Sequence, residues 1–316
     1  MQIVADRGMD LPQSTIDKYN IHIAPLYITL DGKTYKSGID IESKDFYKLL
    51  GNTSSFPLTS MPSPGDFAKL FEELAETDPD ILYISISSGL SGTHKAAVEG
   101  AKLVKKANVW IFNSKTLSGP YGWQVEAAAK TLEMGWSIDQ ILNYIKSIRL
   151  FAGAMFTLSD LKYLIHGGRI SHLKGLLATA LRLQPIIKVE KGSGKYIDAG
   201  RGRTMKGAIR QIATLMEKTY GSGANLRVQL LHADNPKAVE LLRAEIVNRF
   251  EIHFDETLHI APVLGAHTGP SMVGLCAGPM ALFENPVPET TTEKLLDLFK
   301  LPGFSIPLLK ESNLQI

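Results

Sequence analysis

Three short segments of the chain combine hydroxyl side chains with glycines, and each adjoins an expected strand. They are residues 58–67, 85–93 and 264–270. Hydroxyl groups and the backbone N–H groups of such turns are hydrogen-bond donors that can hold an anion. The segments do not supply a nucleophile paired with a base, so we expect these loops to bind a ligand without catalysing a reaction.

The first two segments lead into expected helices. In the first, Ser63 and Asp66 are residue types that cap a helix start, and we expect them to do so here. In the second, Ser91 precedes a helix start, where backbone N–H groups and the helix dipole favour an anion. A serine cap on a glycine-rich turn explains the same residue. The segment has neither a Walker lysine nor a dinucleotide fingerprint, so it does not indicate a nucleotide site.

The third segment contains His267, in a glycine-rich turn that we expect between two strands. A structural role and a functional role for this histidine both stay open. Arg169 and Arg203 also lie in glycine-flanked turns, at 167–171 and 200–204. Most exposed arginines are solvated, but the planar guanidinium fork suits carboxylate and phosphate groups.

Composition excludes several classes of function. The chain has 34 Lys and Arg against 32 Asp and Glu, a net charge of +2, and no long run of like charge, so we expect no nucleic-acid partner. No window approaches about 18 uncharged apolar residues, and we expect a cytoplasmic protein without stable membrane insertion. The histidines show no metal-binding spacing, and Cys276 is the only cysteine, so we expect no metal site and a buried core thiol.

Short apolar runs alternate with segments of helical period along the whole chain. This pattern is typical of parallel strands joined by helices. The expected strands are 2–5, 21–30, 81–86, 108–112, 151–157, 185–190, 226–232, 258–264 and 272–277. The expected helices are 67–74, 97–104, 120–134, 138–148, 158–165, 173–183, 204–220 and 237–250, with a hairpin-like turn at 192–194.

The 316-residue length favours two domains. We predict an N-terminal α/β domain over 1–150, with a mostly parallel sheet flanked by helices, and a smaller C-terminal α/β domain over 151–283. Residues 284–316 form an extension that begins with a polar, proline-rich linker. We expect this extension to dock on the globular part or on a partner chain through its apolar residues.

Taken in order, these segments resemble the DegV family of bacterial fatty-acid-binding proteins, which includes the lipid-binding subunits of fatty acid kinase. The resemblance extends from residue 1 to about 283. It rests on residues 6–12, 59–64, 88–93, 161–170 and 267–270. The chain has Asp6-Arg7-Gly8-Met9-Asp10 where the family commonly begins with Asp-Ser-Thr.

The resemblance implies a protein that is not an enzyme and that holds a long-chain fatty acid, such as palmitate, stearate or oleate, in a lipid cavity between or beneath its two domains. It assigns the fatty-acid carboxylate to Thr59 and Ser91. The supporting polar network that it implies consists of Ser60, Gly92, Arg169, Arg203, His267 and Thr268. It implies no cofactor, and a fatty acid kinase catalytic subunit as the candidate partner protein.

Binding agrees with the energetics, because about 0.8 kcal/mol per buried CH₂ gives a C16 chain on the order of 10 kcal/mol before ordering costs. Two alternatives stay open. One is a serine-dependent hydrolase or acyl-transferase that uses Ser91 and His267. The other is a structural or regulatory protein with an empty pocket.

Overall fold

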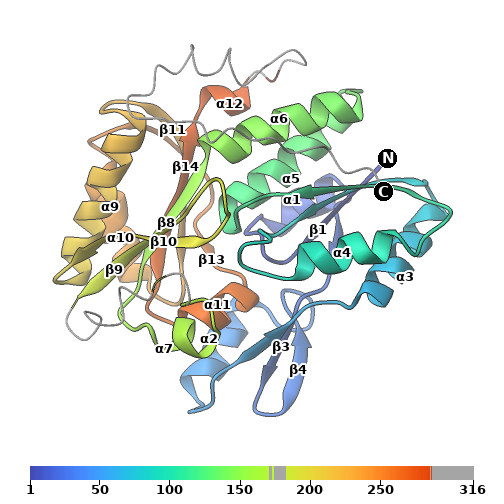
Figure 1. Cartoon of the computed structure of the whole chain (residues 1–316). Helices are drawn as coiled ribbons and strands as arrows, with labels where there is room; N and C mark the ends of the chain where they lie inside the picture. Colours follow the sequence, from blue (N-terminus) through green and yellow to red (C-terminus); the bar gives the residue numbers. More distant parts are fainter. Residues whose placement is uncertain (171–172, 174–182, 285, 287–316) are drawn as a thin grey trace.

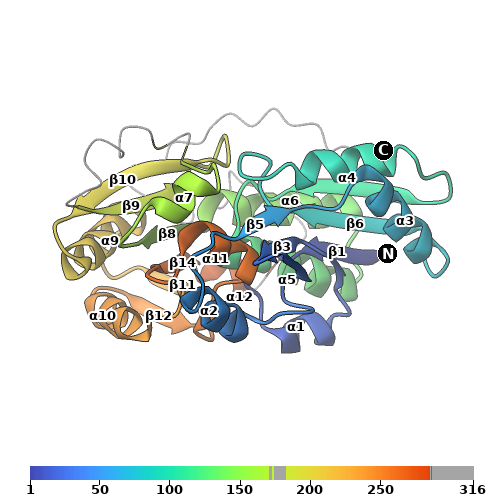
Figure 2. The same ribbon diagram turned by 90° about the horizontal axis from the view of Figure 1, so that it is seen from below.

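The computed structural model describes residues 1–170, 173, 183–284 and 286 (Figure 1). Its strands form sheets of four, seven and three strands. Seen from below, the small sheet and helix α11 (Pro262–Thr268) lie between the two larger sheets (Figure 2). The predicted α/β class is confirmed.

The four-stranded sheet is parallel throughout, as predicted for the first half of the chain. Its strand order is β2 (His22–Ala24), β1 (Gln2–Asp6), β6 (Asp80–Ser85) and β7 (Asn108–Asn113). Alternate residues face opposite sides, as the period of a strand requires. Val4, Ile81 and Tyr83 pack with helices α3 (Pro64–Ala75) and α4 (Thr93–Ala101). Ile3, Leu82 and Ile84 belong to the larger core on the other side.

Helix α5 (Ser118–Glu133) connects the two larger sheets. It contacts β1 of the first sheet as well as β8 (Gly153–Thr157) and β14 (Val273–Pro279) of the second. Twelve of its 16 residues are buried, because it has protein on most sides and no wide solvent face. Helix α6 (Ile138–Phe151) packs beside it. One core cluster therefore includes residues from both halves of the chain, while the division into domains at residue 150 stays a prediction.

The seven-stranded sheet is built from the second half of the chain. Its strand order is β10 (Tyr196–Gly202), β9 (Gln184–Val189), β8, β14, β11 (Asn225–His232) and β12 (Glu251–Phe254), with β13 (Leu258–His259) also paired to β11. Only β12 and β13 pair in parallel, and the other pairings are antiparallel. The late strand β14 lies centrally, between β8 and β11, so the sheet is complete only when residues 273–279 are in place.

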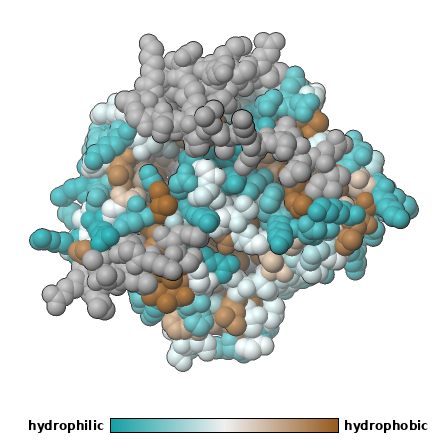
Figure 3. Space-filling model, in the orientation of Figure 1, coloured by the Kyte–Doolittle hydropathy of each residue, from teal (hydrophilic) through white to brown (hydrophobic). Residues whose placement is uncertain are grey.

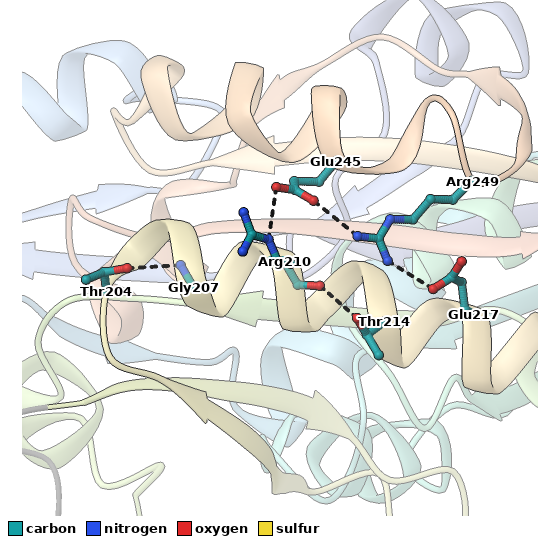
Figure 4. A network of polar contacts seen from close by, with 7 residues as sticks. All are labelled: Thr204, Gly207, Arg210, Thr214, Glu217, Glu245 and Arg249. Atoms are coloured by element: carbon teal, nitrogen blue, oxygen red, sulfur yellow. Dashed lines mark hydrogen bonds and ion pairs between the residues drawn. The ribbon is translucent and has the colours of Figure 1, made fainter.

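Helices α9 (Met205–Tyr220) and α10 (Pro236–Ile246) cover the outer face of this sheet. A chain of ion pairs joins them on the surface, shown in Figure 4. Glu245 lies 3.5 Å from Arg210 and 3.2 Å from Arg249, and Arg249 lies 2.9 Å from Glu217. Arg210 is exposed and the other three side chains are partly buried, and ion pairs near the surface each stabilise a fold only slightly. The buried apolar cluster between the helices and the sheet is therefore the main attachment.

The three-stranded sheet corrects the predicted strand 21–30. That segment is two strands, β2 and β3 (Tyr27–Leu30), in different sheets. Pro25 lies between them and cannot donate to a strand ladder. Strand β3 pairs with β5 (Leu58–Ser60) on one side and with β4 (Lys33–Lys36) on the other. A turn at Asp31 and Gly32, both with positive φ, connects β3 to β4. The helices α1 (Gln13–Lys18) and α2 (Ser43–Gly51) were also not predicted.

A second correction concerns the predicted strand 258–264. Only Leu258–His259 is a strand, and Pro262 begins the helix α11, at whose first position its missing N–H is not needed. The predicted helix 158–165 is shorter, with α7 at Lys162–His166, and α12 (Ala281–Glu284) was not predicted. The predicted helix 173–183 and the docking of the 284–316 extension fall almost wholly outside the described residues.

The buried carboxylate of Asp10 joins three parts of the fold. One oxygen accepts from the Ser118 hydroxyl at the start of α5, at 2.5 Å, and the other from the Ala261 backbone N–H at the start of α11, at 2.6 Å. The Val263 N–H donates to Ser37 at 3.1 Å. The N-terminal half thus supplies the acceptors for the start of α11. Burial raises the pKa of Asp10 to about 6 despite these bonds.

We expect Asp10→Ala to lower the free energy of unfolding by roughly 2 kcal/mol or more, because two buried donors lose their acceptor. Asp10→Asn keeps an oxygen for Ala261 and should cost less. Because the pKa of Asp10 is raised in the folded state, its favourable contribution to the free energy of unfolding is complete at low pH and is lost as the pH rises through about 6.

The free energy of unfolding in urea should therefore fall between pH 5 and pH 7.5 in the wild-type protein, on the order of 1 kcal/mol more than in Asp10→Asn. Asp45→Asn, exposed on α2, is the control. Parallel pH profiles for wild type and Asp10→Asn would contradict this role.

Candidate functional site

A cavity of about 420 Å³ lies where β5, the loop after β6 and helix α11 meet. This volume is in the usual range for small-molecule sites. The cavity brings together six of the eight predicted site residues, which come from four separate segments. They are Thr59, Ser60, Ser91, Gly92, Arg169 and His267. Figure 1 shows α11, which lines the cavity, and α7 beside each other below the seven-stranded sheet.

Thr59 and His267 are in direct contact across the cavity wall. The Thr59 hydroxyl on β5 lies 3.0 Å from Nε2 of His267, near the end of α11. Gly167 makes this position of the ring available, because a Cβ at residue 167 would lie 2.1 Å from His267 Nδ1. Burial, with a smaller contribution from the charge of Arg169, lowers the pKa of His267 to about 3. The imidazole is therefore neutral at pH 7.

The tautomer of His267 decides what Thr59 can do. Within the described residues, Nδ1 of His267 has no hydrogen-bond partner. With the proton on Nε2, the ring donates to Thr59 and leaves the threonine hydroxyl proton free to point into the cavity. With the proton on Nδ1, a donor is left unpaired and Thr59 uses its only proton on the ring. The first arrangement makes Thr59 a donor for an anion in the cavity.

Ser91 makes local hydrogen bonds in the turn before α4, and its role toward an anion stays a prediction. Its hydroxyl accepts from the Thr93 N–H at 3.3 Å, at the start of α4, and lies 2.7 Å from the Thr93 hydroxyl. If Thr93 donates in the second contact, Ser91 keeps its proton for a ligand. A Cβ at Gly92 would lie 2.7 Å from the methyl carbon of Met61, so a side chain there would displace the end of this flexible methionine, which borders the cavity.

Arg169 is the charged residue of the cavity lining. Its Nε donates to the Leu90 carbonyl at 3.2 Å and its Nη1 to the Gly167 carbonyl at 2.6 Å. These bonds fix the guanidinium between the loop that carries Ser91 and the loop that covers His267. Burial lowers its pKa, but an arginine still stays protonated at neutral pH. The cavity is therefore positive, with a neutral histidine and hydroxyl donors around one cation.

Two predicted residues lie elsewhere. Arg203 is exposed in the turn between β10 and α9 and does not line this cavity. Thr268 is buried, and its hydroxyl donates to the Leu264 carbonyl at 3.4 Å. It borders a second, deeper cavity of about 20 Å³, which has room for about one water molecule.

The two cavities adjoin, because both are bordered by Leu117, Tyr196 and Leu264. The deeper one is mainly apolar and lies against β8 and β14. Cys276 lines it and is buried as predicted, and burial raises the pKa of the thiol. The arrangement as a whole is a positive outer cavity with a mixed polar and apolar lining, beside a deeper cavity that is mainly apolar.

The apolar lining was missed by sequence reasoning. In the outer cavity it includes Leu26, Met61, Ile86, Leu90, Leu117, Val263 and Leu264, with Tyr196 beside them. Met61, Ile86, Leu90 and Leu264 lie inside the three segments with hydroxyl residues and glycines, and apolar residues in such loops are a signal that could have been read. Leu26, Leu117, Tyr196 and Val263 lie outside these segments.

The geometry does not pair a nucleophile with a base. In the described part of the chain, the hydroxyl of Ser91 bonds to Thr93 and not to His267, and no carboxylate orients Nδ1 of His267. The described residues also contain no group of three His, Cys, Asp or Glu side chains that could hold a metal ion. None of their helices is long and apolar enough to cross a bilayer. Where grey atoms do not cover it, the face in Figure 3 has hydrophobic residues scattered among polar ones.

Fold and site together define an α/β protein with a positive cavity of mixed lining beside a mainly apolar one. Residues 1–279 match the family model described as an uncharacterised protein of the DegV family. A DegV domain-containing protein of Caldanaerobacter subterraneus subsp. tengcongensis is 32% identical over 274 residues, which is 86% of this chain and 96% of the relative. The chain therefore belongs to the DegV family, as the sequence predicted.

Solved structures share the fold over most of the chain. One described as fatty acid binding of a DegV family protein from Thermus thermophilus is similar with a TM-score of 0.81 and 28% identity, covering 88% of this chain and 99% of that one. Another, described as DegV, a fatty acid binding protein from Bacillus subtilis, has a TM-score of 0.77 and 26% identity, covering 88% and 98%.

We expect His267 to stay neutral from pH 8 down to about pH 4, because its pKa is lowered to about 3. Because the pKa is lowered in the folded state, the contribution of this ring to the free energy of unfolding is complete above its unfolded pKa of roughly 6.5. That contribution is lost as the pH falls toward about 3. Two-dimensional NMR of the imidazole resonances, with His267→Gln to assign the signal, measures the titration directly. A midpoint near 6.5 would mean that the ring is solvated and does not hold Thr59 as described.

Proposed function

We propose that this protein binds a long-chain fatty acid, with the carboxylate in the cavity lined by Thr59, Ser91 and His267 and the acyl chain in the apolar interior. The observation that carries the proposal is that a cavity with hydroxyl donors and one cation lies directly beside a mainly apolar one, the two sharing Leu117, Tyr196 and Leu264. An amphiphile with one anionic end matches a cavity of mixed lining next to an apolar one. The two related structures described as fatty-acid-binding support the same ligand class.

Hydrogen-bond donors make the chamber suitable for a carboxylate. A carboxylate that leaves water needs replacement donors, and each charge-assisted bond contributes roughly 1.5–3 kcal/mol. Thr59 and Ser91 each have a hydroxyl proton available in one of the hydrogen-bond arrangements described above. Arg169 adds a nearby positive charge that favours the ionised form of the acid. Ser60 is exposed at the cavity edge and Gly92 offers backbone, so both are secondary to Thr59 and Ser91 in this proposal.

The acyl chain needs more room than the deeper cavity provides without a ligand. Met155 and Met272 border it, and methionine side chains adapt their shape at low cost. We propose that these side chains move apart as the acyl chain enters. The gain is on the order of 10 kcal/mol for a C16 chain before ordering costs, which is ample to drive such a rearrangement. Palmitate, stearate and oleate are the ligands to test first.

The proposed role is binding and presentation, with the fatty acid as ligand and without a cofactor or a catalytic step of its own. The partner in this proposal is a fatty acid kinase catalytic subunit, and the location is the cytoplasm. Formation of acyl phosphate from ATP and the bound fatty acid, on mixing the protein with such a subunit, is the reaction that this partnership requires. The competing hydrolase or acyl-transferase would need Ser91 to turn over an acyl ester, and loss of such turnover in Ser91→Ala would favour it.

We expect the protein purified from bacteria to carry about one equivalent of fatty acid, because an apolar interior of this kind favours an occupant. Native mass spectrometry, followed by solvent extraction and identification of the lipid, measures both stoichiometry and chain length. Protein that stays free of lipid after incubation with C14 to C18 acids would exclude the proposed function and favour an empty-pocket regulatory role.

We expect Thr59→Ala and Ser91→Ala each to weaken fatty-acid binding about ten-fold or more, through loss of one charge-assisted hydrogen bond. Calorimetric titration of delipidated protein with palmitate measures the effect. Thr214→Ala, on the outer surface of α9, and Ser222→Ala, in an exposed turn, are matched controls that should bind as wild type does. Wild-type affinity in both Thr59→Ala and Ser91→Ala would place the carboxylate elsewhere.

A further inference from the structure

Tyr196 lies at the boundary between the two cavities of the proposed fatty-acid site. It borders both of them, and it is buried, with 4% of its surface exposed. It begins β10 and lies opposite Val189 of β9 in the antiparallel ladder. Its ring makes an edge contact with the ring of Phe156, which lines the deeper cavity, and the two centroids are 5.5 Å apart. Such a contact favours one orientation of the tyrosine ring.

Contacts between the two halves of the chain hold the turn before β10 against the loop that carries Ser91. The Ser87 hydroxyl donates to the Gly194 carbonyl at 2.7 Å. Gly89 lies against the same turn, because a Cβ there would lie 2.5 Å from the carbonyl oxygen of Ser193. Strand β10 begins two residues after Gly194, so its first side chain has a fixed position relative to that loop.

The hydroxyl of Tyr196 has no hydrogen-bond partner within the described residues. It is also not one of the unpartnered polar atoms that are fully covered, so a ligand in the adjoining cavity can reach it. Burial raises the pKa of Tyr196, and the positive charge of Arg169 lowers it by less. The phenol therefore keeps its proton at neutral pH and can donate it. A buried donor without an acceptor is costly, which favours a ligand that supplies one.

We propose that the hydroxyl of Tyr196 is a third donor to the fatty-acid carboxylate, at the point where the head group meets the first carbons of the chain. This inference rests on the proposed function and adds to Thr59 and Ser91 a residue that the sequence did not indicate. The nearby charge of Arg169 supports a carboxylate as the acceptor, because it attracts an anion to the same part of the cavity. The ring, next to Phe156, is left to pack against methylene groups.

A donor at this position selects among lipids of the same chain length. A hydrogen bond to a carboxylate is about twice as strong as one to a neutral acceptor. The phenol of Tyr196 therefore favours a free fatty acid over its ester. The preference belongs to the hydroxyl alone, because a phenylalanine ring at the same place would leave the apolar contacts intact.

The test uses the full-length, delipidated protein and the fluorescent fatty acid cis-parinaric acid, first bound directly and then displaced by palmitate or methyl palmitate. Tyr196→Phe keeps the ring and should bind palmitate about ten-fold more weakly, through loss of one charge-assisted hydrogen bond. Its affinity for methyl palmitate should stay within about three-fold of wild type, because the ester carries no charge. Tyr19→Phe, at the end of α1 and in the lining of neither cavity, is the matched control and should bind both lipids as wild type does.

Three outcomes would contradict this role. Equal losses for palmitate and methyl palmitate in Tyr196→Phe would mean that Tyr196 shapes the cavity without bonding to the carboxylate. Unchanged binding of palmitate with weaker binding of 2-hydroxypalmitate would place the hydroxyl against the chain. Unchanged binding of all three lipids would leave the hydroxyl without a role in binding. In each case wild type still binds fatty acid and the proposed function stands, whereas wild-type protein that binds neither cis-parinaric acid nor palmitate would overturn the proposed function and this inference with it.

Discussion

The buried carboxylate of Asp10 is the interaction on which the arrangement of the candidate site depends. It lies in the loop after the first strand, yet its acceptor oxygens hold the start of α5 and the start of α11. Helix α11 carries His267, Val263 and Leu264 into the outer cavity. Because a carboxylate buried in this way is costly without its donors, the two helix starts and the loop are stable only together. The position of His267 against Thr59 therefore follows from a contact at the other end of the helix.

Burial, as well as the charge of Arg169, decides which side chains of the outer cavity are charged. Arg169 is held by two backbone carbonyls, and the ring that it faces stays neutral because the same loop that carries Arg169 covers it. Gly167 permits that cover, since any side chain there would displace the imidazole. A protonated histidine would have added a second positive charge but would also have altered its contact with Thr59. A neutral ring, a fixed guanidinium and two hydroxyls instead give a chamber whose donors keep the same arrangement across the physiological pH range.

The topology connects the stability of the second sheet with the shape of the interior. Strand β14 forms hydrogen bonds with both β8 and β11, and its residues Gly274, Leu275 and Cys276 line the deeper cavity. A Cβ at Gly274 would lie 2.7 Å from the Met155 carbonyl and from the Phe156 Cβ, so the close approach of β8 and β14 requires glycine there. The segment that completes the sheet thus also forms the wall against which an acyl chain would lie in the proposed function.

The sequence by itself determined the α/β class, the parallel first sheet, the family and the segments that meet at the outer cavity. The class and the first sheet follow from periodicity and turn chemistry, which are local properties that a single chain displays directly, while the family follows from the resemblance of its motifs. The sequence did not show that Pro25 divides one apolar run between two sheets, or that His267 lies on a helix begun by Pro262. It also grouped Arg203 with Arg169 on the same glycine-flanked pattern, although only Arg169 reaches the cavity. Whether a side chain lines a cavity depends on packing between elements distant in the chain, as Leu26, Leu117 and Tyr196 show, and only the tertiary structure decides that packing.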